Sequence, residues 1–186
     1  MRPMKQLSVL PLLLAFSGLF ATLPARAACE IQLSDPRIDY GEMTRGELLG
    51  RPGNALTAVE LRMGDPRESE ITVICDRPTP LKLMFSGPAK DADSYLFGEQ
   101  GRATLTLHDV TLDDRPVTIE RAGTEAAAMA FSAGQPLQFR KEGQIASGST
   151  LRAKVTIVTW LAADATRVSE RKQWQLNGSF IVSDEG

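Results

Sequence analysis

Residues 71–85 read ITVICDRPTPLKLMF, and their apolar side chains recur at every second position. The alternating positions before the prolines are Ile71, Val73 and Cys75, and those after them are Leu81, Leu83 and Phe85. Successive side chains of a strand point to opposite faces of a sheet, so this period predicts two half-buried strands. The proline-rich stretch 77–80 has turn chemistry, and we expect a turn there between the two strands.

The same period of two extends over most of the chain outside this segment. It covers residues 59–63 upstream, and residues 105–107, 151–157 and 174–182 downstream. Short strands at fairly even spacing, each with one buried face, predict an all-β antiparallel sandwich. Residues 123–129, which include three consecutive alanines, are the only candidate for a short helix.

The first 27 residues predict a secretory signal peptide. Arg2 and Lys5 supply positive charge, an apolar stretch follows, and Ala25-Arg26-Ala27 matches the small-x-small pattern of a cleavage site. The apolar stretch is too short to span a membrane comfortably. The alternative is a lipoprotein signal with Cys29 lipidated, and Arg26 stands where that signal requires an aliphatic residue. We therefore expect residues 1–27 to be removed and residues 28–186 to form one exported domain.

The mature domain is moderately acidic. Of the 21 Lys and Arg residues, three lie in the signal peptide, which contains no Asp or Glu. The remaining 159 residues carry 18 basic and 23 acidic side chains, a formal net charge of −5. This balance does not indicate a nucleic acid or an anionic membrane as a partner. A chain of this length can bury a sizeable core without other support.

Cys29 and Cys75 both belong to the mature domain. An even pair of cysteines in an exported chain predicts a disulfide, with two free buried thiols as the alternative. A bond that closes a loop of this length stabilises a fold by about 4 kcal/mol in the chain-entropy treatment.

Three local features occur in a fixed order along the mature chain. Cys29 opens it and is soon followed by Asp39-Tyr40-Gly41; the second cysteine lies in ITVICDRPT at residues 71–79; and an alternating segment that contains Gly178 closes it. In this order and spacing the chain resembles the chaperone–usher fimbrial subunits, and most closely the beta-fimbriae-type pilin-like proteins, which pair "DYG" with "I-x-C-D-x-P-T".

The resemblance implies an immunoglobulin-like β-sandwich that lacks its last strand. Such a domain is completed by a strand from a periplasmic chaperone, which the N-terminal extension of a neighbouring subunit later replaces. Under this interpretation Cys29 and Cys75 tie the first strand to its neighbour. The residues expected on the last strand, where chaperone and donor strand pair, are Trp174, Leu176, Phe180 and Val182.

Two features differ from the family's pattern. After cleavage only Ala28 precedes Cys29, where family members carry the extension that serves as donor strand. The chain also ends Ser183-Asp184-Glu185-Gly186, without the aromatic residue that pilins commonly carry next to last. A subunit that can accept a strand but has none to donate is expected at the tip of a fibre.

Catalytic and metal-binding patterns are weak in this sequence. His108 is the only histidine, and Asp109 follows it. Neighbouring strand residues point to opposite faces, so we expect the two not to form the His–Asp pair of a hydrolase, and expect His108 to face solvent. With two cysteines assigned to a disulfide, no cluster of zinc ligands remains. We therefore expect no enzyme activity and no cofactor.

Trp160 lies at the end of its predicted strand, out of phase with Val155 and Ile157. An exposed tryptophan can bind a sugar, so Trp160 is a candidate contact for a ligand or a host receptor. Trp174 keeps phase with Leu176, which favours packing in the core instead.

Two functional hypotheses follow. The first is a structural or adhesive fimbrial subunit, minor or at the tip, whose partners are a periplasmic chaperone, an outer-membrane usher and neighbouring subunits; it would pass through the periplasm to the cell surface. The second is a stand-alone periplasmic or secreted β-sandwich that binds a ligand. A complete sandwich is stable alone, whereas an incomplete one aggregates or purifies with a chaperone.

Overall fold

The structure is a computed structural model that describes residues 28–37, 40–167 and 172–184. The predicted signal peptide and Asp39 of the Asp-Tyr-Gly motif lie outside these ranges. No helix within them is long and apolar enough to cross a membrane.

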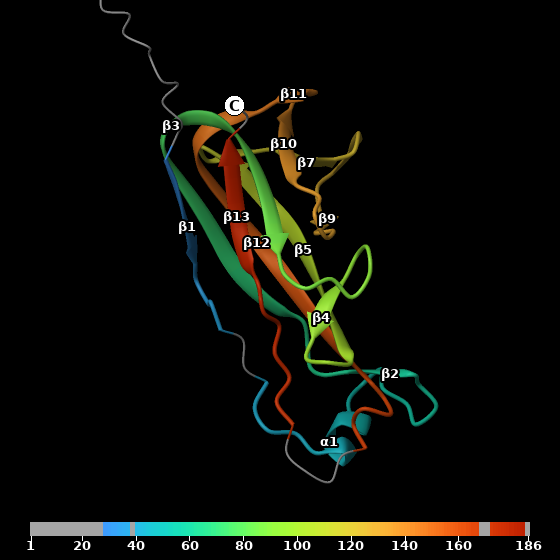
Figure 1. Cartoon of the computed structure of the whole chain (residues 1–186). Helices are drawn as coiled ribbons and strands as arrows, with labels where there is room; N and C mark the ends of the chain where they lie inside the picture. The colour runs from blue at the N-terminus through green and yellow to red at the C-terminus, as the bar shows by residue number, and fades with distance from the viewer. Residues whose placement is uncertain (1–27, 38–39, 168–171, 185–186) are drawn as a thin grey trace, which may run out of the picture.

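The described chain forms thirteen strands and one five-residue helix (Figure 1). The first elements are β1 (Cys29–Leu33), α1 (Arg45–Leu49), β2 (Glu60–Arg62), β3 (Arg67–Ser86), β4 (Tyr95–Phe97) and β5 (Gly101–Leu112). The short middle strands are β6 (Arg115–Pro116), β7 (Thr118–Arg121), β8 (Thr124–Ala126) and β9 (Met129–Ala130). The last are β10 (Leu137–Lys141), β11 (Gln144–Ile145), β12 (Ser147–Ala162) and β13 (Ser179–Asp184).

Strand β3 links the two layers of the molecule. Its first arm pairs with β1 and β12, and its second arm pairs with β10 and β13. The expected break at residues 77–80 is wrong as a strand boundary, because β3 is continuous through these residues. The chain nevertheless arcs over between the two arms at the top of Figure 1. A β-bulge lies opposite on β12, between Gly148 and Thr150, and bulges accommodate prolines that cannot donate to a ladder.

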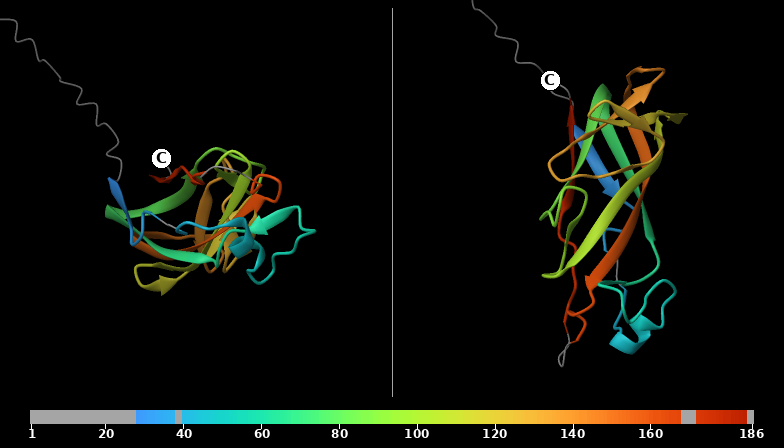
Figure 2. Two further views of the ribbon diagram at one scale, coloured as in Figure 1. Left: turned by 90° about the horizontal axis from the view of Figure 1, so that it is seen from below. Right: turned by 90° about the vertical axis from the view of Figure 1, so that its right-hand side faces the viewer.

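Every ladder is antiparallel, and the strand order along the main path is β4-β5-β12-β3-β10-β7-β8. Figure 2 shows the strands curving around a common interior. The side chains that meet in this core from the first layer include Ile71, Val73, Leu105, Leu107, Leu151 and Val155. Those from the second layer include Leu81, Leu83, Phe85, Ile119, Leu137 and Phe139. The prediction of an all-β antiparallel sandwich is confirmed.

A second, smaller core lies at the lower end of the molecule in Figure 1, beside α1 and β2. Its buried members are Leu48, Leu61, Met63, Phe97, Ala103 and Leu161. The helix that covers it begins at a capping box, in which Thr44 Oγ1 accepts a hydrogen bond from Glu47 N and the Glu47 carboxylate accepts one from Thr44 N. The Thr44 hydrogen bonds also hold the pKa of the Glu47 carboxyl below its ordinary value.

The predicted helix at residues 123–129 is wrong. Residues 124–126 form β8, which pairs with β7, and Met129 begins β9. Ala122 and Gly123 join β7 to β8 with φ angles of 50° and 83°, the left-handed pair that a two-residue hairpin turn requires. The hairpin and its ladder override the helix propensity of the alanines.

Candidate interaction site at two free strand edges

Strands β1 and β13 leave one side of the sandwich open. Within the described residues each of them pairs only with β3, β1 with the first arm and β13 with the second. The two strands are neighbours in space, with Cα atoms within 8 Å of each other, and no ladder joins them. Their outer edges therefore present unpaired backbone N–H and C=O groups, which is a template for a further strand.

The inward side chains of both strands are only partly covered. Ile31 and Leu33 of β1, and Phe180 and Val182 of β13, pack against the main core but remain half-buried. By contrast Val73 and Leu83, on the two arms of β3 between them, are each 1% exposed. The core side chains of β3 are thus fully covered, whereas those of β1 and β13 along the open side are only partly covered.

Phe180 is the best-anchored residue of the open side. Its ring meets those of Phe85 and Phe131 edge-on, with centroids 5.1 and 5.5 Å apart. Phe85 in turn contacts Tyr95, whose hydroxyl donates to the Phe85 carbonyl at 3.2 Å. Burial raises the pKa of that Tyr95 hydroxyl, so it remains a neutral donor over the physiological range. This aromatic cluster fixes the position of β13.

The predicted last strand is shorter than its periodicity indicated. Phe180 and Val182 lie on β13 as expected, whereas Trp174 and Leu176 lie in the extended segment that precedes it. There Leu176 forms an isolated bridge with Phe97, and Gln175 O accepts a hydrogen bond from Gly98 N at 2.8 Å. Both side chains pack on the smaller core, and Trp174 also lies against Gly98.

Gly178 lets this segment approach the sheet closely. A Cβ atom at this position would lie 2.3 Å from Phe85 Cζ and 2.6 Å from the Ser86 carbonyl oxygen. No side chain fits there without displacing β3 or β13. The glycine that the sequence placed inside a strand therefore marks the point where the chain crosses Phe85 to enter β13.

The disulfide closes the upper end of the open side. Cys29 and Cys75 are register partners on β1 and β3, and they are bonded. Ala28 O accepts a hydrogen bond from Asp76 N at 3.0 Å just before the bond, and Ser34 N donates to Glu70 O after the strand ends. The bond fixes the register of a five-residue strand that pairs, within the described residues, with β3 alone.

Sequence analysis missed Ile31 and Leu33 as members of this site. Residues 29–33 alternate apolar and polar side chains, the signal that identified the other strands. The segment was interpreted only through its cysteine.

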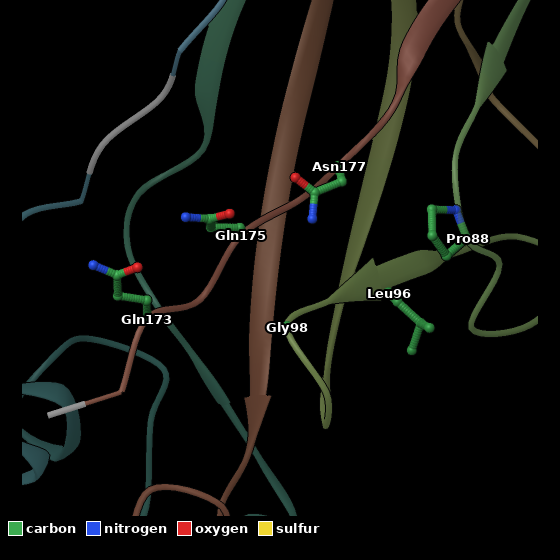
Figure 3. A pocket seen from close by; sticks show the side chains of 6 residues that line it. All are labelled: Pro88, Leu96, Gly98, Gln173, Gln175 and Asn177. Carbon is green, nitrogen blue, oxygen red and sulfur yellow. The ribbon is translucent and has the colours of Figure 1, made fainter. Parts of the chain in front are cut away.

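A cleft lies between the segment before β13 and the chain around β4 (Figure 3). Its volume is about 340 Å³, and side chains of Gln173, Gln175 and Asn177 line one wall while Pro88 and Leu96 line the opposite one. Gly98 completes the lining. The three amides come from alternate residues, opposite in phase to Trp174 and Leu176, as expected for an extended segment.

The side chain of Trp160, which we expected to be exposed at the end of its strand, is less accessible to solvent than predicted. It is half-buried, and the guanidinium of Arg102 stacks over its ring at 3.9 Å from the centroid. The Glu60 carboxylate holds Arg102 there by hydrogen bonds of 2.8–3.0 Å. One face of the indole is therefore already occupied by a cation–π contact.

The prediction that His108 and Asp109 point apart is wrong. His108 Nδ1 lies 3.3 Å from Asp109 Oδ2, and His108 Nε2 lies 2.8 Å from Thr156 Oγ1. The cause is a bulge in the β5–β12 ladder between Arg152 and Lys154, where Asp109 adopts φ 52°.

The same outer face carries two further charges beside this histidine. Glu68 Oε2 lies 3.6 Å from His108 Nε2, and Glu68 Oε1 accepts from Lys154 Nζ at 3.1 Å. This hydrogen bond to the Glu68 carboxylate raises the pKa of Lys154. No cluster of three His, Cys, Asp or Glu side chains that could hold a metal ion occurs within the described residues.

Comparison with known proteins finds similarity among solved structures. No family model matches the chain, and no curated protein matches it. Among solved structures it is similar to the crystal structure of the P pilus rod subunit PapA, with 14% sequence identity and a TM-score of 0.46. That match covers 90% of this chain and 98% of the pilus subunit.

Proposed function

We propose that this chain is a structural subunit of a chaperone–usher fimbria that accepts a donor strand along its open side. The observation that carries the proposal is the pair of free edges on β1 and β13, with half-buried apolar side chains beneath them. The exported character of the sequence, its disulfide and its order of motifs agree with this role.

Binding of a strand at this site is β-augmentation. Backbone hydrogen bonds to the free edge supply affinity, and every second side chain of the added strand enters the core. Each square ångström of apolar surface removed from water contributes about 25 cal/mol. Covering Ile31, Leu33, Phe180 and Val182 would thus complete a core that the chain alone leaves unfinished.

The partners are those that the resemblance to fimbrial subunits implies. A periplasmic chaperone would supply the first strand, an outer-membrane usher would receive the complex, and a neighbouring subunit would supply the permanent strand. The protein would pass through the periplasm to the cell surface. Trp160 stays a proposed ligand or receptor contact, through the ring face that Arg102 does not cover.

The first prediction concerns the chaperone. The tagged full chain, expressed in its native host and purified from the periplasm, is expected to co-purify with an immunoglobulin-like chaperone in about equal amount. Without that partner it should aggregate, because its half-buried apolar side chains are unprotected. A monodisperse, cooperatively folding protein obtained alone would favour the stand-alone binding module instead.

The second prediction places the subunit at the fibre tip. With cleavage after Ala27, one residue precedes Cys29, and a strand needs about five or six. Such a subunit accepts a strand but has none to donate, so it fits only the distal end, at about one copy per fibre. Immunogold labelling of intact fibres should mark one end. Gold along the shaft would contradict this placement, and N-terminal sequencing of the mature protein checks the cleavage site.

A further inference from the structure

We infer that the loop between α1 and β2 is a second contact surface, on which Leu56 and Val59 bind the folded body of the subunit that donates the strand. The inference rests on the proposed function, and it adds an interface that strand exchange alone does not require. Neither side chain is part of either hydrophobic core.

Leu56 is 77% exposed and Val59 is 85% exposed. The other exposed large apolar side chains in the described part of the chain, Ile74, Ile145 and Ile181, are only 42–44% exposed. Single exposed apolar residues are ordinary, but here two highly exposed apolar side chains lie three residues apart on one short loop, which we call the apolar patch.

This loop is held in place by hydrogen bonds. Asn54 Nδ2 donates to Leu48 O at 2.7 Å and to Arg62 O at 2.9 Å, while Asn54 Oδ1 accepts from Arg62 N at 2.7 Å. Asn54 thereby ties the end of α1 to β2.

Further bonds hold the part of the loop that carries the two side chains. Ala58 N donates to Ala55 O at 3.0 Å, Val59 O accepts from Ala163 N at 2.9 Å, and Ala58 packs on the smaller core. Leu56 and Val59 are therefore presented on an ordered backbone, so binding them costs little conformational entropy.

The polarity of the ladder at β13 indicates where the donor subunit lies when its donor strand pairs with this edge. In the layer that contains β13 every neighbouring pair is antiparallel. A strand that continues this order beyond β13 runs from the Asp184 end to the Ser179 end, and antiparallel pairing is the more stable kind. In Figure 1 that direction leads from the upper end, marked C, to the lower end, where α1 and β2 lie.

The body of the donor subunit follows its donor segment in sequence. The donor segment therefore runs toward the lower end of this domain, and the donor's body follows it on the side that presents the loop from α1 to β2 in both Figure 1 and Figure 2. A folded domain abutting this end would cover Leu56 and Val59. The patch and the free edge of β13 are thus two parts of one interface.

Site-specific photo-crosslinking in the native host tests this interface. A benzophenone amino acid is placed in the full chain at Leu56, at Ser183 on β13, or at Ile145 as an exposed apolar control on β11, at the opposite end (Figure 1). Crosslinked peptides are identified by mass spectrometry. We expect Ser183 to capture the N-terminal segment of a subunit, Leu56 to capture the folded body of that same protein, and Ile145 to capture neither.

The outcomes separate the inference from the function on which it rests. If Ser183 captures a subunit and Leu56 captures nothing above the Ile145 background, or a different protein, the loop contact is wrong and strand acceptance stands. If Ser183 captures no subunit, the proposed function fails and this inference fails with it.

Substitution of the patch gives a quantitative readout. The double variant Leu56→Asp/Val59→Asp should reduce the yield of the Ser183 crosslink to the neighbouring subunit at least about tenfold, because it removes two apolar contacts and desolvates two charges. Capture by the chaperone should be unchanged, since both side chains are exposed in the free domain. An unchanged crosslink yield would overturn the inference.

Discussion

Replacing Phe180 with aspartate is expected to destroy both the docking of β13 and the capture of the protein by its chaperone. The phenyl ring packs edge-on against Phe85 and Phe131, so the substitution removes two aromatic contacts and places a charge over the main core. Loss of such packing together with desolvation of a carboxylate costs on the order of 3 kcal/mol, a large share of the stability of a domain. The measurement is the amount of exported protein that co-purifies with the chaperone.

Ile181 provides the matched control. It is the next residue on the same strand, it is also apolar, and it is 42% exposed on the opposite face. Ile181→Asp should therefore leave export and capture close to those of the unsubstituted protein. Equal damage from both substitutions would show that β13 presents a different face to its partner, and equal tolerance would show that β13 is not part of the site.

The period of two predicted the strands well wherever apolar and polar residues alternated without interruption. The odd-numbered residues of β3 point inward on both sides of the arc at residues 77–80. The alternation therefore continues through the prolines, where we had predicted that the strand would end. The prolines can be recognised in the sequence, but the bulge on β12 that accommodates them cannot. Whether the chain turns or bends therefore depended on a partner strand that is remote in sequence.

The same limit applies to the end of the chain. Trp174 and Leu176 share the phase of Phe180, so periodicity assigned them to one strand. In the structure the segment that carries them meets β4 through one isolated bridge and joins the β3 ladder only after Gly178. The alternation of apolar residues indicates which face of a segment is buried, but it does not indicate which strand that segment pairs with.

Local irregularities were the least predictable features. A bulge reversed the expected relation of His108 and Asp109, and a left-handed pair at Ala122 and Gly123 turned a predicted helix into a hairpin. Both depend on backbone angles at one or two residues. Alanine rarely adopts a positive φ, and aspartate does so more readily than most residues but only at isolated positions, so the periodicity alone did not place these irregularities.

The open side also makes the disulfide more important than its position near the end of the chain indicates. Strand β1 has five residues, one partner strand among the residues that the structure describes, and inward side chains that are only half-buried. Without the disulfide, its ladder and packing alone would have to hold it against solvent. The covalent bond between Cys29 and Cys75 spans 46 residues, and closing a loop of that length is worth about 4 kcal/mol.

The double variant Cys29→Ser/Cys75→Ser is therefore expected to lower the melting temperature of the chaperone-bound protein by roughly 8–16 °C, taking about 2–4 °C per kcal/mol for a domain of this size. The loss should be local first: amides of β1 should exchange with deuterium much faster, while those of β12 stay protected. Chemical reduction of the unsubstituted protein is the control, because it breaks the same bond without changing side-chain size, and it should give the same exchange pattern. Mass spectrometry of the non-reduced exported protein tests the premise. Two free thiols there, or an unchanged melting temperature after substitution, would mean that packing alone holds β1 and that the open side is less exposed than its half-buried residues indicate.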